Sequence, residues 1–304
     1  MRRGFVAALA ALVAWVAVAA EPAEARSDGR NKRVLFIHGL DATGDPGTNC
    51  AAYWNDMERK FRDWGWSQAL IELSFYRYDT NCDHTINHHG RHSRHYGSGH
   101  YASGGHGANT NIRHLGYHLA WYIYSHYSKD GRVVDVVAHS MGGLIIRYAL
   151  AQAQRGYDQF PPRLLVEDVV TMGTPHAGAK AWTSLCPFTQ CDQMDAGSTF
   201  LEWLRDHASE PDGAGGTDWS AFSAADDNLV SMESGVAMGA CHKVQYFTSS
   251  NIEHGDFMHV RSGARSKQTS ANVRRRNCPH GWVTDNSSHW PVRRADLAAA
   301  FRSH

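Results

Sequence analysis

Short apolar runs alternate along the chain with segments in which apolar residues recur at helical spacing. The helical spacing covers residues 109–127 and 141–154. The apolar runs occupy residues 33–37, 69–76, 133–139 and 164–173. Because the apolar residues in these runs are mostly consecutive rather than at every second position, we expect parallel strands buried on both faces. The pattern predicts an α/β fold, doubly wound, with a mostly parallel central sheet and helices on both faces.

The N-terminus has the pattern of a cleavable export signal. Arg2 and Arg3 precede an apolar run over residues 4–20, and small residues follow it. A membrane anchor is disfavoured, because the run is at the short end of the ~17–25 residues that a span needs and no charged flank follows it. We therefore expect a signal peptide at residues 1–25, a single domain at residues 26–304, and secretion.

All six cysteines lie beyond the predicted signal. In an exported protein an even number of cysteines favours disulfides over metal thiolates. We expect each cysteine to pair with its neighbour in the sequence: Cys50 with Cys82, Cys186 with Cys191, and Cys241 with Cys278.

The charges balance, with 30 basic and 30 acidic residues. A net charge of zero gives no field that would attract nucleic acid or an anionic membrane surface. We expect neither of these as a partner, and we expect a monomer.

Ser140 lies where a predicted strand meets a predicted helix, within VVAHSMGG. A nucleophile on a tight strand-turn-helix bend crowds the residues two before and two after it, and here these are Ala138 and Gly142. The bend leaves the backbone N–H of Met141 at the helix start, where it would bind the oxyanion formed when a carbonyl is attacked. A second donor is expected from the N–H of Leu40, just after the first strand. These features predict a nucleophilic serine.

The sequence resembles the bacterial secreted lipases of the α/β-hydrolase superfamily, including the small Bacillus lipases and their actinobacterial relatives. The resemblance implies an α/β-hydrolase fold with a small cap-like insertion at about residues 177–216. Besides the C-terminal acid and histidine segments, it rests on FIHGL (36–40), VVAHSMGG (136–143), VVTMGTPHAG (169–178) and QMDAGSTFLEWL (193–204).

A serine hydroxyl needs a histidine to take its proton and a carboxylate to hold that histidine's tautomer. In this superfamily the order along the chain is serine, acid, histidine. Residues 219–234 resemble the family's strand ending in S-x-x-D, and counting from Ser223 places the acid at Asp226, with Asp227 as the alternative. The base matches His254, in the loop after a predicted strand at residues 243–250.

His289 is the alternative base, because it precedes the final predicted helix in a segment similar to another lipase branch. That branch has an aspartate where this chain has His280. If His289 were the base, Asp256 or Glu253 would be the acid.

Seven histidines lie among glycines, serines and tyrosines at residues 84–106. Their spacing matches no closed set of metal ligands, and carboxylates are nearly absent. We therefore expect a glycine-rich surface loop. The alternative is a structural calcium or zinc ion that takes no part in the chemistry.

The resemblance implies a secreted serine hydrolase that cleaves carboxylic esters through an acyl-enzyme on Ser140. His254 is expected to accept its proton and Asp226 to steady the imidazolium, without a required cofactor. Lipid esters are favoured, triacylglycerol in particular, with contact to lipid aggregates. Short soluble esters, polyesters and acyl transfer to an alcohol would use the same machinery. A hydrolase fold kept only for binding is the alternative from another class.

Overall fold

The computed structural model describes residues 28–43, 45–89, 106–180, 186–259, 263–269 and 281–301. The expected signal peptide and Cys278 lie outside these residues, as does most of the histidine-rich stretch. Within the described ranges, no helix is long and apolar enough to cross a membrane.

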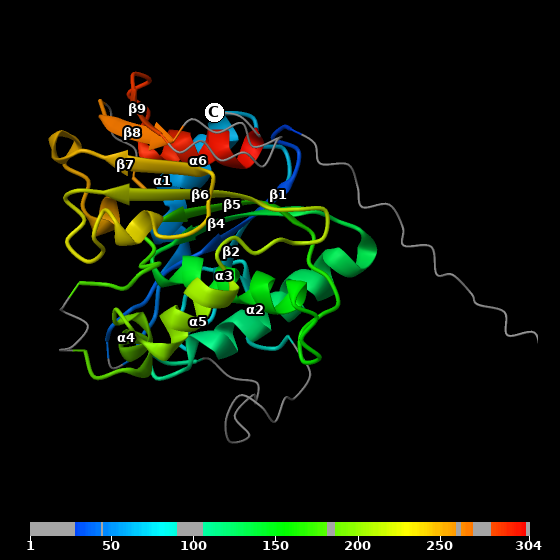
Figure 1. Ribbon diagram of the computed structural model, residues 1–304. Helices are drawn as coiled ribbons and strands as arrows, with labels where there is room; N and C mark the ends of the chain where they lie inside the picture. The colour runs from blue at the N-terminus through cyan, green and yellow to red at the C-terminus, as the bar shows by residue number, and fades with distance from the viewer. Residues whose placement is uncertain are drawn as a thin grey trace, which may run out of the picture.

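A nine-stranded sheet forms the centre of the molecule, in the order β3-β2-β1-β4-β5-β6-β7-β8-β9 (Figure 1). Among the described strands, β1 to β7 pair in parallel, whereas β8 is antiparallel to β7 and β9 is antiparallel to β8. The mostly parallel central sheet expected from the sequence is thereby confirmed. The strands are β1 Arg33–Ile37, β2 Leu70–Ser74, β3 His84–Thr85, β4 Val134–His139, β5 Val166–Met172, β6 Asp218–Ala224, β7 His242–Tyr246, β8 Ser266–Thr269 and β9 Trp282–Asp285.

Helices cover both faces of this sheet, with α1 and α6 on one side and α2, α3 and α5 on the other (Figure 1). The α-helices are α1 Cys50–Asp63, α2 Ile112–His126, α3 Met141–Gln154, α4 Thr189–Met194, α5 Thr199–His207 and α6 Pro291–Ala300. Short 3₁₀ turns are η1 Ser128–Asp130, η3 Ser234–Val236, η4 Thr248–Ser250 and η5 His254–Asp256.

The continuous apolar character of the strands follows from this layering. In β1, Leu35 and Ile37 pack with the α2 and α3 side, whereas Val34 and Phe36 pack with the α1 and α6 side. Successive side chains of a strand point to opposite faces, so a strand covered on both faces carries apolar residues on both of them. The pattern in the sequence therefore reports burial on both sides.

The sequence did not lead us to α1 or to the two antiparallel strands. Helix α1 buries Cys50, Trp54, Met57 and Phe61, which recur at helical spacing along an otherwise polar segment. The Cys50–Cys82 disulfide ties the start of this helix to the segment after β2, and Cys186 is bonded to Cys191. Both of these predicted pairs are confirmed.

Acidic residues surround a buried lysine at the amino ends of the central strands. The Lys32 ammonium lies 3.4 Å from Asp135, 3.2 Å from Glu167 and 3.3 Å from Asp168. Burial raises the pKa of Asp135 to about 7, against the opposing effect of the lysine charge. This cluster lies at the sheet edge opposite to the one that carries Ser140.

Candidate active site

Ser140 is a one-residue bend between β4, which ends at His139, and α3, which begins at Met141. Its backbone has φ 55° and ψ −131°, a conformation that a non-glycine residue rarely adopts. Two hydrogen bonds hold the bend: its N–H donates to the Met172 carbonyl at 2.9 Å, and its carbonyl accepts from Thr174 Oγ1 at 2.9 Å. The surrounding strands thus keep the strained conformation in place.

Direct steric contacts explain why the residues around Ser140 are small. A Cβ added at Gly142 would overlap the carbonyl oxygen of Ile37, and one added at Gly39 would lie 2.6 Å from Ser140 Cβ. Ala138 is fully buried in β4, beside Ile37 of β1. The crowding expected from the sequence is therefore present on both sides of the serine.

Three side chains from distant parts of the chain form a hydrogen-bonded line at Ser140. His254 Nε2 lies 2.9 Å from Ser140 Oγ. On the other side of the ring, His254 Nδ1 lies 2.9 Å and 3.0 Å from the two carboxylate oxygens of Asp227. The arrangement is that of a serine, a base and an acid that orients the base.

The acid in this line is Asp227, so the expectation that Asp226 contacts the histidine is wrong. Both residues lie in the turn after β6, where Asp227 is buried and Asp226 is half-buried. Oδ1 of Asp227 also accepts the N–H groups of Leu229 and Val230, each at 2.8 Å. The turn therefore folds around the carboxylate of the second aspartate, one position beyond the count from Ser223.

The histidine that faces the serine is His254, in the 3₁₀ turn η5 after β7, as the sequence favoured. His289 lies in the loop between β9 and α6, where its backbone N–H donates to Ser287. Asp256 and Glu253, the alternative acids, cap η5: the Glu253 N–H donates to Asp256 Oδ2 at 3.0 Å. These two carboxylates thus help to shape the turn that presents His254.

His139, which its place beside Ser140 in the sequence suggests as a packing and hydrogen-bonding residue, forms a further layer with Tyr53, which the sequence did not indicate. His139 Nε2 lies 2.8 Å from the carbonyl oxygen of His254, and its Nδ1 lies 2.5 Å from the Tyr53 hydroxyl. Burial lowers the pKa of His139 well below its usual value, so the ring is neutral and can donate from Nε2 while accepting at Nδ1. The pair therefore holds the backbone of His254 in position.

A second buried histidine fixes the loop after β1. His38 Nε2 lies 3.1 Å from Asp79 Oδ2, which also accepts the N–H groups of Phe75 and Tyr76 at 2.8 Å each. Burial of Asp79 raises its pKa, but the hydrogen bond with His38 and the other contacts outweigh this and leave the pKa below its usual value. The network anchors the loop that carries Leu40.

A cavity opens above Ser140, with a volume of about 420 Å³ that includes its mouth. Leu40, Pro175, Met194, Leu229 and Val230 supply an apolar wall. Leu40 thus reaches the site, and Met141 is the first residue of α3, whose backbone N–H has no acceptor within the helix. Both expected oxyanion donors belong to segments next to the serine.

Helices α4 and α5 lie in the expected insertion at residues 177–216. Met194 at the end of α4 lines the cavity, whereas Phe200, Leu201 and Leu204 of α5 are buried in the core on the α2 and α3 side. The contribution of this segment to the cavity therefore comes from its first half.

Comparison with known proteins gives a family match and several structural likenesses. The family described as the PGAP1-like alpha/beta domain matches residues 28–193. Phospholipase PlaB from Legionella pneumophila shares 11% identity with a TM-score of 0.44, over 65% of this chain and 40% of that one. Mature lipase BlEst2 from Bacillus licheniformis shares 19% identity with a TM-score of 0.40, over 68% of this chain and 71% of that one.

The product of the gene lin2722 from Listeria innocua shares 12% identity with a TM-score of 0.45, over 76% of this chain and 89% of that one. By comparison, the match to the Legionella phospholipase covers 40% of that protein, which is well under half of its length. The curated proteins contain no match to the sequence. Because the family match covers more than half of the residues and includes β1, β4 and the Ser140 bend, the chain belongs to the family of the PGAP1-like alpha/beta domain.

Proposed function

We propose that this protein is a serine hydrolase that cleaves carboxylic esters through an acyl-enzyme on Ser140. The observation that carries the proposal is the continuous line from Ser140 Oγ through His254 to Asp227, with contacts of 2.9 Å on each side of the ring. This line opens into an apolar cavity. An accidental grouping would not also require a strained backbone at the serine.

In the proposed mechanism each proton transfer belongs to a named atom. His254 Nε2 takes the Ser140 proton while Oγ attacks the ester carbonyl, and Asp227 holds the Nδ1–H so that Nε2 is free to act as the base. His254 then returns the proton to the leaving alkoxide. Water, activated by the same nitrogen, hydrolyses the acyl-enzyme and regenerates the serine.

The oxyanion of each tetrahedral intermediate would be bound by the backbone N–H groups of Leu40 and Met141. Removing one such donor typically costs about 3 kcal/mol in the barrier. The buried pair of His38 and Asp79 fixes the segment that bears Leu40, so this donor would be held in place before the substrate arrives.

Lipid esters are the substrate class we propose. The apolar wall made by Leu40, Pro175, Met194 and Val230 suits an acyl chain. Among the described residues that line the cavity, none is an aspartate, glutamate, lysine or arginine. The two disulfides favour an oxidising compartment, which supports secretion.

Chromogenic esters with acyl chains of increasing length test the activity and the substrate class together. We expect turnover by the wild-type protein and its loss in Ser140→Ala, with Ser249→Ala, an exposed serine after β7, as the matched control. A fluorophosphonate should label Ser140 in the wild type and the control only. Unchanged turnover in Ser140→Ala would end the proposal, and a preference for acetyl over longer chains would replace lipids with short soluble esters.

A further inference from the structure

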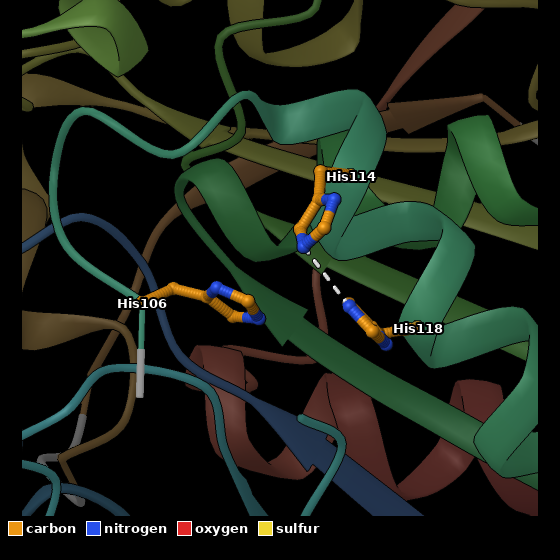
Figure 2. A group of neighbouring side chains, drawn as sticks. All are labelled: His106, His114 and His118. Carbon is orange, nitrogen blue, oxygen red and sulfur yellow. Dashed lines mark hydrogen bonds between the residues drawn. The ribbon is translucent and has the colours of Figure 1, made fainter. Parts of the chain in front are cut away.

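Three histidines converge on the α2 side of the sheet. His114 and His118 lie one turn apart on α2, and His106 comes from the loop before that helix (Figure 2). One nitrogen from each ring lies within 4.8 Å of the other two, and all three residues are buried. Figure 2 shows the His106 ring pointing into the space beside the other two rings.

We propose that His106, His114 and His118 bind one divalent transition-metal ion of the zinc class, a structural site that ties the loop before α2 to the helix. The site is distinct from the proposed ester-hydrolysing residues. It takes one ion per chain and leaves a fourth coordination position for water.

An unsatisfied nitrogen points to a ligand. Nε2 of His106 is buried and has no hydrogen-bond partner among the described residues, although the residue is only 7% exposed. Leaving such an atom unpaired in the interior costs about 1–3 kcal/mol. A metal ion would use this lone pair.

The ring of His118 is set up as a ligand. Its Nδ1 lies 2.5 Å from the His89 carbonyl oxygen, an acceptor, so this nitrogen carries the proton. The lone pair therefore lies on Nε2, which is 2.9 Å from His114 Nε2. A metal-bound histidine usually donates its other N–H to a carbonyl or carboxylate in this way.

The dimensions of the group suit a small ion. A tetrahedral zinc ion with Zn–N bonds of about 2.0–2.1 Å separates its nitrogen ligands by about 3.3 Å. The 2.9 Å between His114 Nε2 and His118 Nε2 lies close to this separation. The three ligand nitrogens lie within 4.8 Å of one another, so a small rotation of the His106 ring would bring its nitrogen into the same range. In the metal-free state the proton between the two Nε2 atoms occupies the space that the ion would take.

The group contains only imidazoles, which suit zinc, copper and nickel, whereas calcium and magnesium require oxygen ligands. Of the two ions considered from the sequence, the structure thus favours zinc over calcium.

Hydrogen bonds hold the backbone of His106 in place before metal binding. His106 pairs with Tyr76 in a β-bridge. The His106 N–H donates to the Phe75 carbonyl at 3.0 Å, and the His106 carbonyl accepts from the Arg77 N–H at 2.9 Å. Phe75 in turn stacks on His38. Metal binding would therefore lock the loop after β2 against α2.

The test begins with chelator-treated full-length protein, titrated with Zn²⁺ by calorimetry and followed by thermal unfolding. We expect one tight equivalent and, at a hundredfold excess over Kd, a Tm higher by about 5–10 °C. His106→Leu should weaken binding by more than about 100-fold. His126→Leu is the matched control, since His126 lies two turns after His118 on α2 but outside the group.

The metal-free stability of His106→Leu separates loss of a ligand from misfolding. Because Nε2 has no partner among the described residues, leucine should leave the metal-free Tm unchanged or raised. Co²⁺ bound to the wild type should show the intense visible bands of four-coordinate cobalt. This measurement does not depend on the folding of any variant. The proposal is overturned by weak six-coordinate bands, by no saturable Zn²⁺ binding, or by equal affinity in His106→Leu and wild type.

Discussion

Asp227→Asn tests the line of proton transfer more sharply than removal of the serine. In the wild type both carboxylate oxygens face His254 Nδ1, while Oδ1 also accepts two backbone N–H groups. An asparagine can keep its amide oxygen on Leu229 and Val230, and it then places its NH₂ group against Nδ1. A donor at that position forces Nδ1 to be an acceptor, so the proton moves to Nε2 and the ring can no longer take the Ser140 proton.

The expected loss is large because the wrong tautomer blocks catalysis without disturbing the fold. Replacing the acid by its amide in a serine, histidine and aspartate triad costs about 10⁴-fold in kcat. At 1.36 kcal/mol per factor of ten this corresponds to about 5.4 kcal/mol in the barrier. The retained hydrogen bonds to Leu229 and Val230 should keep the loss of unfolding free energy below about 1.5 kcal/mol.

Asp226→Asn is the matched control, since it makes the same change one residue earlier in the same turn. Its kcat on a chromogenic ester should stay within about threefold of the wild type, because Asp226 does not face His254. Urea unfolding of both variants checks their stability. The role of Asp227 is refuted if Asp226→Asn loses as much activity as Asp227→Asn, or if Asp227→Asn retains more than a tenth of wild-type kcat.

Three further changes test the surroundings of the site and the core. Gly142→Ala should lower kcat at least ~10-fold and destabilise the fold by about 1–3 kcal/mol, because its Cβ overlaps a β1 carbonyl; Gly281→Ala, which meets nothing within 4 Å, should do neither in the same ester and urea assays. Replacing Cys50 and Cys82 by alanine opens a loop with a sequence separation of 32 and should cost about 3–4 kcal/mol in urea unfolding; a cost below 1 kcal/mol would contradict this. The pKa of Asp135 is raised to about 7 in the folded protein, whereas it is about 3.9 in the unfolded chain. The contribution of this carboxyl group to the unfolding free energy is therefore full below pH ~4 and is lost as the pH rises through ~7. Between pH 5 and 8 the wild type should therefore lose at least ~1 kcal/mol more unfolding free energy than Asp135→Asn, and parallel pH curves would contradict the assignment.

Local chemistry in the sequence was sufficient for the fold class and the serine. Strands buried on both faces carry apolar residues on both of them, and a one-residue bend must have small neighbours, so β1, β4, β5 and the surroundings of Ser140 could be predicted from short segments. The disulfides Cys50–Cys82 and Cys186–Cys191 join cysteines that are neighbours in the sequence, which the order of the cysteines already suggested.

The partners of the serine depended on how distant segments meet in space. Asp226 and Asp227 are equivalent as sequence, and only the path of the turn after β6 buries the second beside His254. The three histidines of the proposed metal site also depend on the tertiary structure. The spacing of His114 and His118 is visible along one helix, but His106 joins them only because a β-bridge to Tyr76 holds its loop there. A side chain's type and spacing are local properties, whereas its direction is set by the packing of strands and helices that lie far from it in the chain.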